Sequence, residues 1–176
     1  MLFTARSILT MLHGLAFGGG ALFALVAALA ALRVLPGPDG AAASSRQARS
    51  LSLMIGAAAV LLWMAVLGGT YLVFPPYRAT PPEGLVDLAA YPRSLLLASP
   101  DTAWLHAFAM EVKEHVPWMA AMLATGVAFV SVRERATFLS DRALRRMVTV
   151  GLSVCFVLAA YAALLGTFVN KVAPLQ

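Results

Sequence analysis

Histidine and carboxylate side chains near the ends of two apolar segments have the greatest capacity for chemistry in this chain. His13 lies early in the first apolar segment, and Glu111, Glu114 and His115 lie together at the start of a later one. Imidazole nitrogens and carboxylate oxygens are donor atoms that proteins use to bind haem iron, zinc and manganese. These residue types therefore predict a coordination site, provided that the fold brings the two segments together.

Two kinds of coordination fit these residues. In the first, His13 and His115 face each other and supply the two axial ligands of a haem b. Gly14 and Gly18 would then leave room for the flat macrocycle beside the first segment. In the second, a divalent metal binds a mixed set of nitrogen and oxygen ligands. The predicted metal ligands are His13, Glu111, Glu114 and His115, with His106 as an alternative ligand.

The same residues allow two other interpretations. Lys113 could pair with Glu111 or Glu114, so that the polar residues form a structural network in a cofactor-free accessory subunit of a larger membrane complex. Alternatively, a histidine or glutamate could exchange protons with a quinol in a pocket near Tyr71 and Trp118. The sequence contains no glycine-rich phosphate loop, no nucleophile elbow and no Cys-x-x-Cys pair. Enzymatic activity is therefore uncertain, and the expectation is a protein that is not an enzyme on its own.

The composition identifies the elements that must position these residues. Hydrophobic residues make up 61% of the 176 residues and charged residues only 12%, against roughly a quarter in a soluble domain. Four stretches are long enough to cross roughly 30 Å of hydrocarbon as helices. They span about 8–35, 51–74, 100–132 and 147–169. The sequence predicts an all-α integral membrane protein, one domain over residues 1–176, with four transmembrane helices in an up-down-up-down bundle.

The basic residues predict how this bundle is oriented. Eight of the 13 lysines and arginines lie in the two loops 33–49 and 133–146, which together carry the whole net charge of +5. By the positive-inside rule, the loops 36–50 and 133–146 are cytoplasmic, and both termini lie on the outer side of a plasma (inner) membrane. The high charge is thus a topology signal rather than a sign of nucleic-acid binding. The expected partners are the lipid bilayer and other membrane subunits or a second copy.

The third helix is expected to carry the polar groups on one side. Ser99 is a good N-cap and Pro100 suits the first helical position, so the helix can run to about Val132, or about 50 Å. Counting back from its cytoplasmic end places Glu111, Glu114 and His115 near the outer interface, level with His13 of the first helix. At about 100° per residue, one arc is wholly apolar and the opposite arc holds every ionisable group. We expect the apolar arc to face lipid and the polar arc to face protein. The apolar arc comprises Leu105, Phe108, Ala109, Val112, Val116, Met119 and Ala120.

The outer loop, about 75–99, and the loop pattern as a whole carry two further expectations. Segments 83–90 and 93–98 could form short helices at the interface, separated by prolines. In addition, Arg49 precedes Gly69 by 20 residues, and Arg146 precedes Gly166 by 20 residues. Each glycine begins a Gly-Thr-aromatic sequence, which is consistent with a tandem repeat of two helices. The alternative is that these residue types are simply common at such places.

Overall fold

The computed structural model describes residues 4–38 and 44–174, and these residues are 81% helical with no strand. Four long helices make up the fold, and each is long and apolar enough to cross a membrane. Three of them contain a π-helical segment, in which the backbone hydrogen bonds span one residue more than in an α-helix. The first comprises α1 (Ala5–Met11), η1 (Leu12–Gly19) and α2 (Gly20–Val34). The second comprises α3 (Ser45–Gly68), η2 (Gly69–Val73) and α4 (Phe74–Tyr77). The third comprises α6 (Pro100–Trp104), η3 (Leu105–Met110) and α7 (Glu111–Arg133), and the fourth is α8 (Arg142–Val172).

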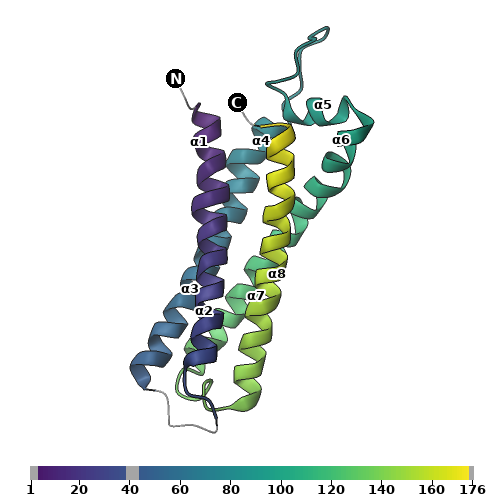
Figure 1. The fold of residues 1–176 in the computed structure, drawn as a ribbon. Coiled ribbons are helices and arrows are strands. Elements are labelled where there is room, and N and C mark those ends of the chain that lie inside the picture. Colours follow the sequence, from purple (N-terminus) through teal and green to yellow (C-terminus); the bar gives the residue numbers. More distant parts are fainter. Residues whose placement is uncertain (1–3, 39–43, 175–176) are drawn as a thin grey trace.

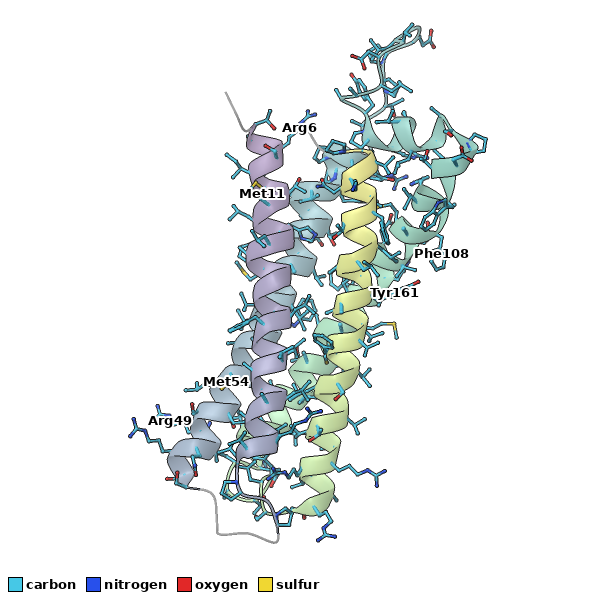
Figure 2. All side chains as sticks on the ribbon, in the orientation of Figure 1. Arg6, Met11, Arg49, Met54, Phe108 and Tyr161 are labelled. Atoms are coloured by element: carbon cyan, nitrogen blue, oxygen red, sulfur yellow. The ribbon has the colours of Figure 1, made fainter. Side chains whose placement is uncertain are left out.

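The four helices lie side by side, and consecutive helices run in opposite directions (Figure 1). Helix α2 packs against α3 and α8, and α7 packs against the same two helices, so α2 and α7 occupy diagonal corners. We call the end of the bundle that carries Ala5 and Val172 the termini end, and the opposite end the basic-loop end. Arg6 lies at the termini end and Arg49 at the basic-loop end (Figure 2).

The helices extend beyond the predicted apolar stretches because polar residues cap them. The side chains of Thr4, Ser44, Ser99 and Asp141 each accept a hydrogen bond from a backbone N–H of the first turn. The predicted start of the third helix at Ser99 and Pro100 is confirmed. The segment 83–90 is not helical, because Gly84 has a positive φ of 78° and the Asp87 carboxylate accepts from the Ala89 N–H in a turn. Only α5 (Pro92–Leu97) forms a helix within this loop.

Close helix contact occurs at different glycines from those that the sequence suggested. A Cβ atom at Gly14 would meet no atom within 4 Å, and at Gly18 it would meet only the carbonyl oxygen of His13 in the same helix. At Gly69, Gly151 and Gly166, by contrast, a Cβ atom would lie within 2.6 Å of a side chain from another helix. The last three glycines are therefore the positions where the fold needs the absence of a side chain.

The expected division of the third helix into a lipid face and a protein face is wrong in its upper part. Leu105 and Ala109, placed on the lipid face, are 3% and 0% exposed. Glu111 and His115, placed on the protein face, have side chains that are 64% and 72% exposed. The π-helical segment η3 explains part of the difference, because its extra residue per turn rotates everything before it relative to α7. Phe108 points outward as expected (Figure 2).

At the basic-loop end, Arg145 joins the fourth helix to the end of the first. Its guanidinium donates to the carbonyl oxygens of Pro36 at 2.7 Å and Leu35 at 3.0 Å, and also to that of Leu32. These carbonyl groups lie at or just beyond the C-terminus of α2, where the helix leaves acceptors without intrahelical donors. Arg145 therefore caps α2 from another helix.

Candidate functional site

The first polar group at the termini end is His13, which lies in η1 and is held against the second helix. Its Nδ1 lies 2.8 Å from the carbonyl oxygen of Ala65. A carbonyl oxygen only accepts, so Nδ1 carries the hydrogen and donates it, and in the neutral ring Nε2 keeps a free lone pair. The ring lies directly over Gly69, where a Cβ atom would be 2.6 Å from its Cε1. The second helix thus both orients the imidazole and provides the space for it.

The second polar group is Lys113, which lies in α7 and is seated on the fourth helix. Its Nζ would be 2.5 Å from a Cβ atom at Gly166, so the side chain reaches across the surface of α8. Lys113 is largely buried and lies close enough to the His13 ring for their charges to interact. Within residues 4–38 and 44–174 it makes no hydrogen bond or ion pair. An ammonium group near the membrane interior without a counter-charge is unusual, because its desolvation is not offset.

The third polar group is a chain of three side chains that fixes the outer loop to the bundle. Arg93 of α5 donates from Nε to Nε2 of His106 at 3.3 Å. Because Nε2 accepts, the neutral ring carries its hydrogen on Nδ1, which donates to the Tyr77 hydroxyl oxygen at 2.9 Å. Both nitrogen atoms of His106 are therefore engaged within the chain. The Tyr77 ring stacks on Phe74 with 6.0 Å between centroids.

Two arginines and a glutamate surround this chain. The guanidinium of Arg78 lies over the Phe74 ring, 5.4 Å from its centroid. Arg78, Arg93 and Glu114 all lie within electrostatic range of Tyr77 and His106. The polar chain therefore sits in a mixed field of charges, where α4, α5 and η3 meet.

The fourth polar group is the exposed pair of Glu111 and His115, one turn apart on α7. The Nδ1 of His115 donates to the backbone carbonyl oxygen of Glu111 at 2.8 Å and lies 3.8 Å from its carboxylate. As with His13, this bond leaves Nε2 with a free lone pair. Both side chains project from the bundle surface rather than into it.

The structure does not gather the predicted ligand set into one group. His13 contacts α3 and η2, whereas His115 bonds to its own helix and is exposed. Glu114 is half-buried and lies nearer to the Tyr77 and His106 pair. Among the residues that the structure describes, no three His, Cys, Asp or Glu side chains are placed to hold one metal ion. Gly14 is exposed beside open space, so it does not obstruct a ligand at the surface of η1.

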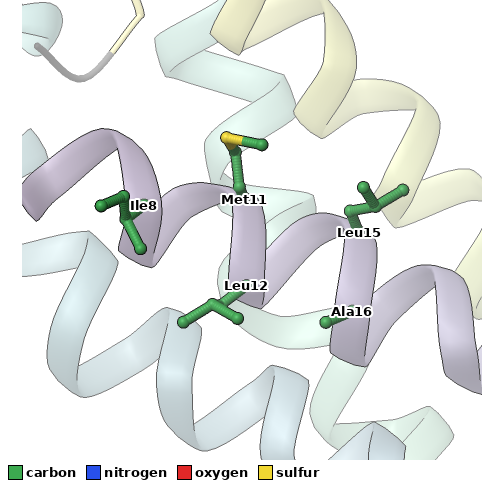
Figure 3. A pocket seen from close by; sticks show the side chains of 5 residues that line it. All are labelled: Ile8, Met11, Leu12, Leu15 and Ala16. Atoms are coloured by element: carbon green, nitrogen blue, oxygen red, sulfur yellow. The ribbon is translucent and has the colours of Figure 1, made fainter. Parts of the chain in front are cut away.

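Two shallow hollows on the surface lie away from these groups. One, of about 400 Å³, is lined by side chains of the first helix alone (Figure 3). The lining residues are Ile8, Met11, Leu12, Leu15 and Ala16. The other, of about 660 Å³, lies on the fourth helix around Arg142 and Met147 at the basic-loop end. Neither hollow is lined by a histidine, and the first presents an apolar surface of the kind that lipid chains cover.

Sequence reasoning missed the importance of Lys113, Tyr77 and Arg93. The signal for Lys113 was present, because it precedes Arg133 by 20 residues, which is the spacing between His13 and Arg33. The comparison by residue type favoured His115, whose spacing is 18. No local signal pairs Arg93 with His106, because the contact depends on how the loop folds back over η3.

Fold and site together define an all-helical protein with four helices that could span a membrane and with four separate polar groups near one end of the bundle. No family model, curated protein or solved structure matches this chain.

Proposed function

We propose that the chain is an accessory subunit of a larger membrane complex and that a partner subunit binds to the surface formed by Glu111 and His115. The observation that carries the proposal is the exposure of these two ionisable side chains on a helix that otherwise crosses the membrane with apolar residues. Ionisable groups at this level are costly against lipid and are usually paired. A partner with complementary polar side chains would provide that pairing.

The contacts of the other polar groups support the same proposal. His13 is bound to Ala65, and His106 is bound to both Tyr77 and Arg93, so these side chains stabilise the packing of the chain itself. Their arrangement gives the termini end a fixed shape, which an accessory subunit needs in order to present a docking surface.

The experiment is site-specific photocrosslinking in native membranes. A photoreactive amino acid replaces His115, and the matched control replaces Leu15, which is 71% exposed on the diagonal helix. The proposal expects a defined heteromeric adduct from position 115, its loss in the Glu111→Lys variant, and no such adduct from position 15. It is overturned if position 115 gives no adduct, or if Glu111→Lys leaves the adduct yield unchanged.

A second candidate function, a haem- or metal-binding redox subunit, rests on the geometry of two imidazoles. In both His13 and His115, Nδ1 donates to a backbone carbonyl oxygen and Nε2 is free. This is the arrangement that orients histidine ligands in metal and haem sites. Because the two rings have separate surroundings, a haem b or a divalent metal would use one of them, with any second axial ligand coming from elsewhere, such as another copy of the chain.

Visible spectroscopy and metal analysis of the purified protein test this second candidate. A Soret band, with sharpened bands after dithionite reduction, that disappears in His13→Ala or in His115→Ala would support haem. Stoichiometric metal that is lost in one of the same variants would support a metal site. Purified protein that is colourless and free of metal after expression with haem precursor and metal supplements would exclude both.

We also propose that the protein lies in the plasma membrane with the termini end facing outward and both basic loops facing the cytoplasm. The distribution of arginine supports this orientation, since Arg33, Arg49, Arg133 and Arg146 all lie at the basic-loop end.

A further inference from the structure

His13 and Lys113 have equivalent surroundings in the two halves of the chain. Each is the polar side chain of an odd-numbered long helix, and each lies against a glycine of the helix that follows. A Cβ atom at Gly69 would be 2.6 Å from His13, and a Cβ atom at Gly166 would be 2.5 Å from Lys113. Both glycines begin a Gly-Thr-aromatic sequence. The same notch therefore holds an imidazole in one half and an ammonium in the other.

The buried residues of the two halves support this equivalence. The first helix buries Ala21, Leu25, Ala28 and Leu32, and the third buries Ala120, Ala124, Val127 and Ser131, each 99 residues later. His13 and Lys113 are separated by 100 residues. The π-helical segment η1 accounts for the additional residue, because it lies between His13 and the buried residues of α2. The two polar side chains thus occupy the same position on diagonal helices.

Together, these side chains offer complementary hydrogen-bonding groups with no partner for one of them. The ammonium of Lys113 has three hydrogens to donate, and within the described parts of the chain none of them has an acceptor. The Nε2 of His13 is a free acceptor, because Nδ1 already donates to Ala65. The net charge of this pair is positive, and the helices around it are apolar. Both the charge and the unused donors call for a ligand that supplies an oxygen.

We propose that His13 and Lys113 form a binding site for a lipid-soluble molecule whose polar end is a hydrogen-bond-accepting oxygen. The Lys113 ammonium donates to that oxygen, and the Nε2 of His13 accepts from any hydroxyl group beside it. The surrounding helices are apolar, so the ligand reaches the site from the bilayer. The chemistry fits the carboxylate of a fatty acid and the carbonyl of a quinone equally. This proposal is independent of the docking surface at Glu111 and His115.

The test measures the quenching of tryptophan fluorescence in the purified protein. Trp63 and Trp118 form a T-shaped pair with centroids 5.7 Å apart in the helices that flank the site. The two probes are 9,10-dibromostearate and decylubiquinone, each of which quenches tryptophan on contact. The variants are Lys113→Met and, as a matched control, Lys171→Met, which removes an exposed lysine at the same end.

Saturable quenching by at least one probe is expected in the wild-type protein. Its Kd should rise about tenfold or more in Lys113→Met and remain unchanged in Lys171→Met. Saturation by dibromostearate alone identifies a carboxylate ligand, and saturation by decylubiquinone alone identifies a quinone. His13→Gln, which removes the other half of the site, replaces Lys113→Met if that variant does not fold. The proposal is overturned if neither probe gives saturable quenching, or if the Lys113 and Lys171 variants bind equally well.

Discussion

Replacing Gly69 by alanine should destabilise the protein through a specific clash with His13. The new Cβ atom would lie 2.6 Å from Cε1, 3.2 Å from Nδ1 and 3.3 Å from Nε2 of the imidazole ring. The ring cannot move away freely, because its Nδ1 is hydrogen-bonded to the Ala65 carbonyl oxygen at 2.8 Å. The methyl group can therefore fit only if this bond lengthens or the two helices separate.

The expected magnitude follows from three contributions. Overpacking of this kind costs about 1–3 kcal/mol. Weakening the hydrogen bond of His13 costs about 0.5–1.5 kcal/mol. Replacing glycine by alanine in a helix returns up to about 1 kcal/mol. The free energy of unfolding should therefore fall by about 2 kcal/mol in Gly69→Ala.

The matched control is the neighbouring residue Gly68, where a Cβ atom would meet nothing within 4 Å. Gly68→Ala should leave the stability unchanged or raise it by up to about 1 kcal/mol. Reversible unfolding in mixed micelles of mild detergent and dodecyl sulfate measures both variants. The two substitutions are adjacent and chemically identical, so their opposite effects isolate the contact with His13.

A double-mutant cycle tests the cause directly. In the His13→Ala background the imidazole is absent, and Gly69→Ala should cost little or become stabilising. A coupling energy of about 1 kcal/mol or more between the two positions is expected. The reasoning fails if Gly69→Ala is as stable as Gly68→Ala, or if its cost is the same with and without His13.

Three further predictions concern other parts of the molecule. Arg145→Ala should lower the free energy of unfolding by about 2–3 kcal/mol, because it leaves the end of α2 without its cap, and Arg145→Lys should not restore it, since a single ammonium cannot reach the several carbonyl oxygens that the guanidinium joins; the same unfolding assay measures both variants. Tyr77→Phe removes the acceptor of the His106 Nδ1–H and should cost about 1 kcal/mol, with faster proteolysis of the loop that carries α5, whereas unchanged proteolysis would show that this bond does not hold the loop. In intact cells, an impermeant maleimide should label Glu83→Cys but not Ser140→Cys, which should react only after permeabilisation; the reverse pattern would invert the proposed orientation.

The four long helices were predictable because the length of an apolar run decides whether a segment can cross a bilayer. The start of the third helix was also predictable, since Ser99 and Pro100 are local signals that act within one turn. The non-helical segment 83–90 was less accessible. Its apolar residues favoured a helix, but the turn at Gly84 and the side chain of Asp87 determine the local backbone.

The faces of the third helix could not be predicted because the projection assumed a regular α-helix. No sequence rule signals a π-helical segment, and η3 changes the angular position of every residue before Glu111 relative to those that follow. Leu105 and Ala109 consequently pack into the bundle. The exposure of His115 follows from the inward direction of Lys113, since residues two apart on a helix point in nearly opposite directions.

The contrast between His115 and Lys113 shows why residue type was a poor guide to the site. Matching histidine with histidine placed the equivalent of His13 two residues too late on the third helix, on its exposed side. Distance from the basic-loop end is the better measure, because each helix rises by about 1.5 Å per residue from that boundary. By this measure Lys113 corresponds to His13, and the glycine beneath each side chain agrees. If the two hairpins arose by duplication, their shared feature is a notch at a fixed depth, and the difference in chemistry between its two occupants gives the proposed site both a donor and an acceptor.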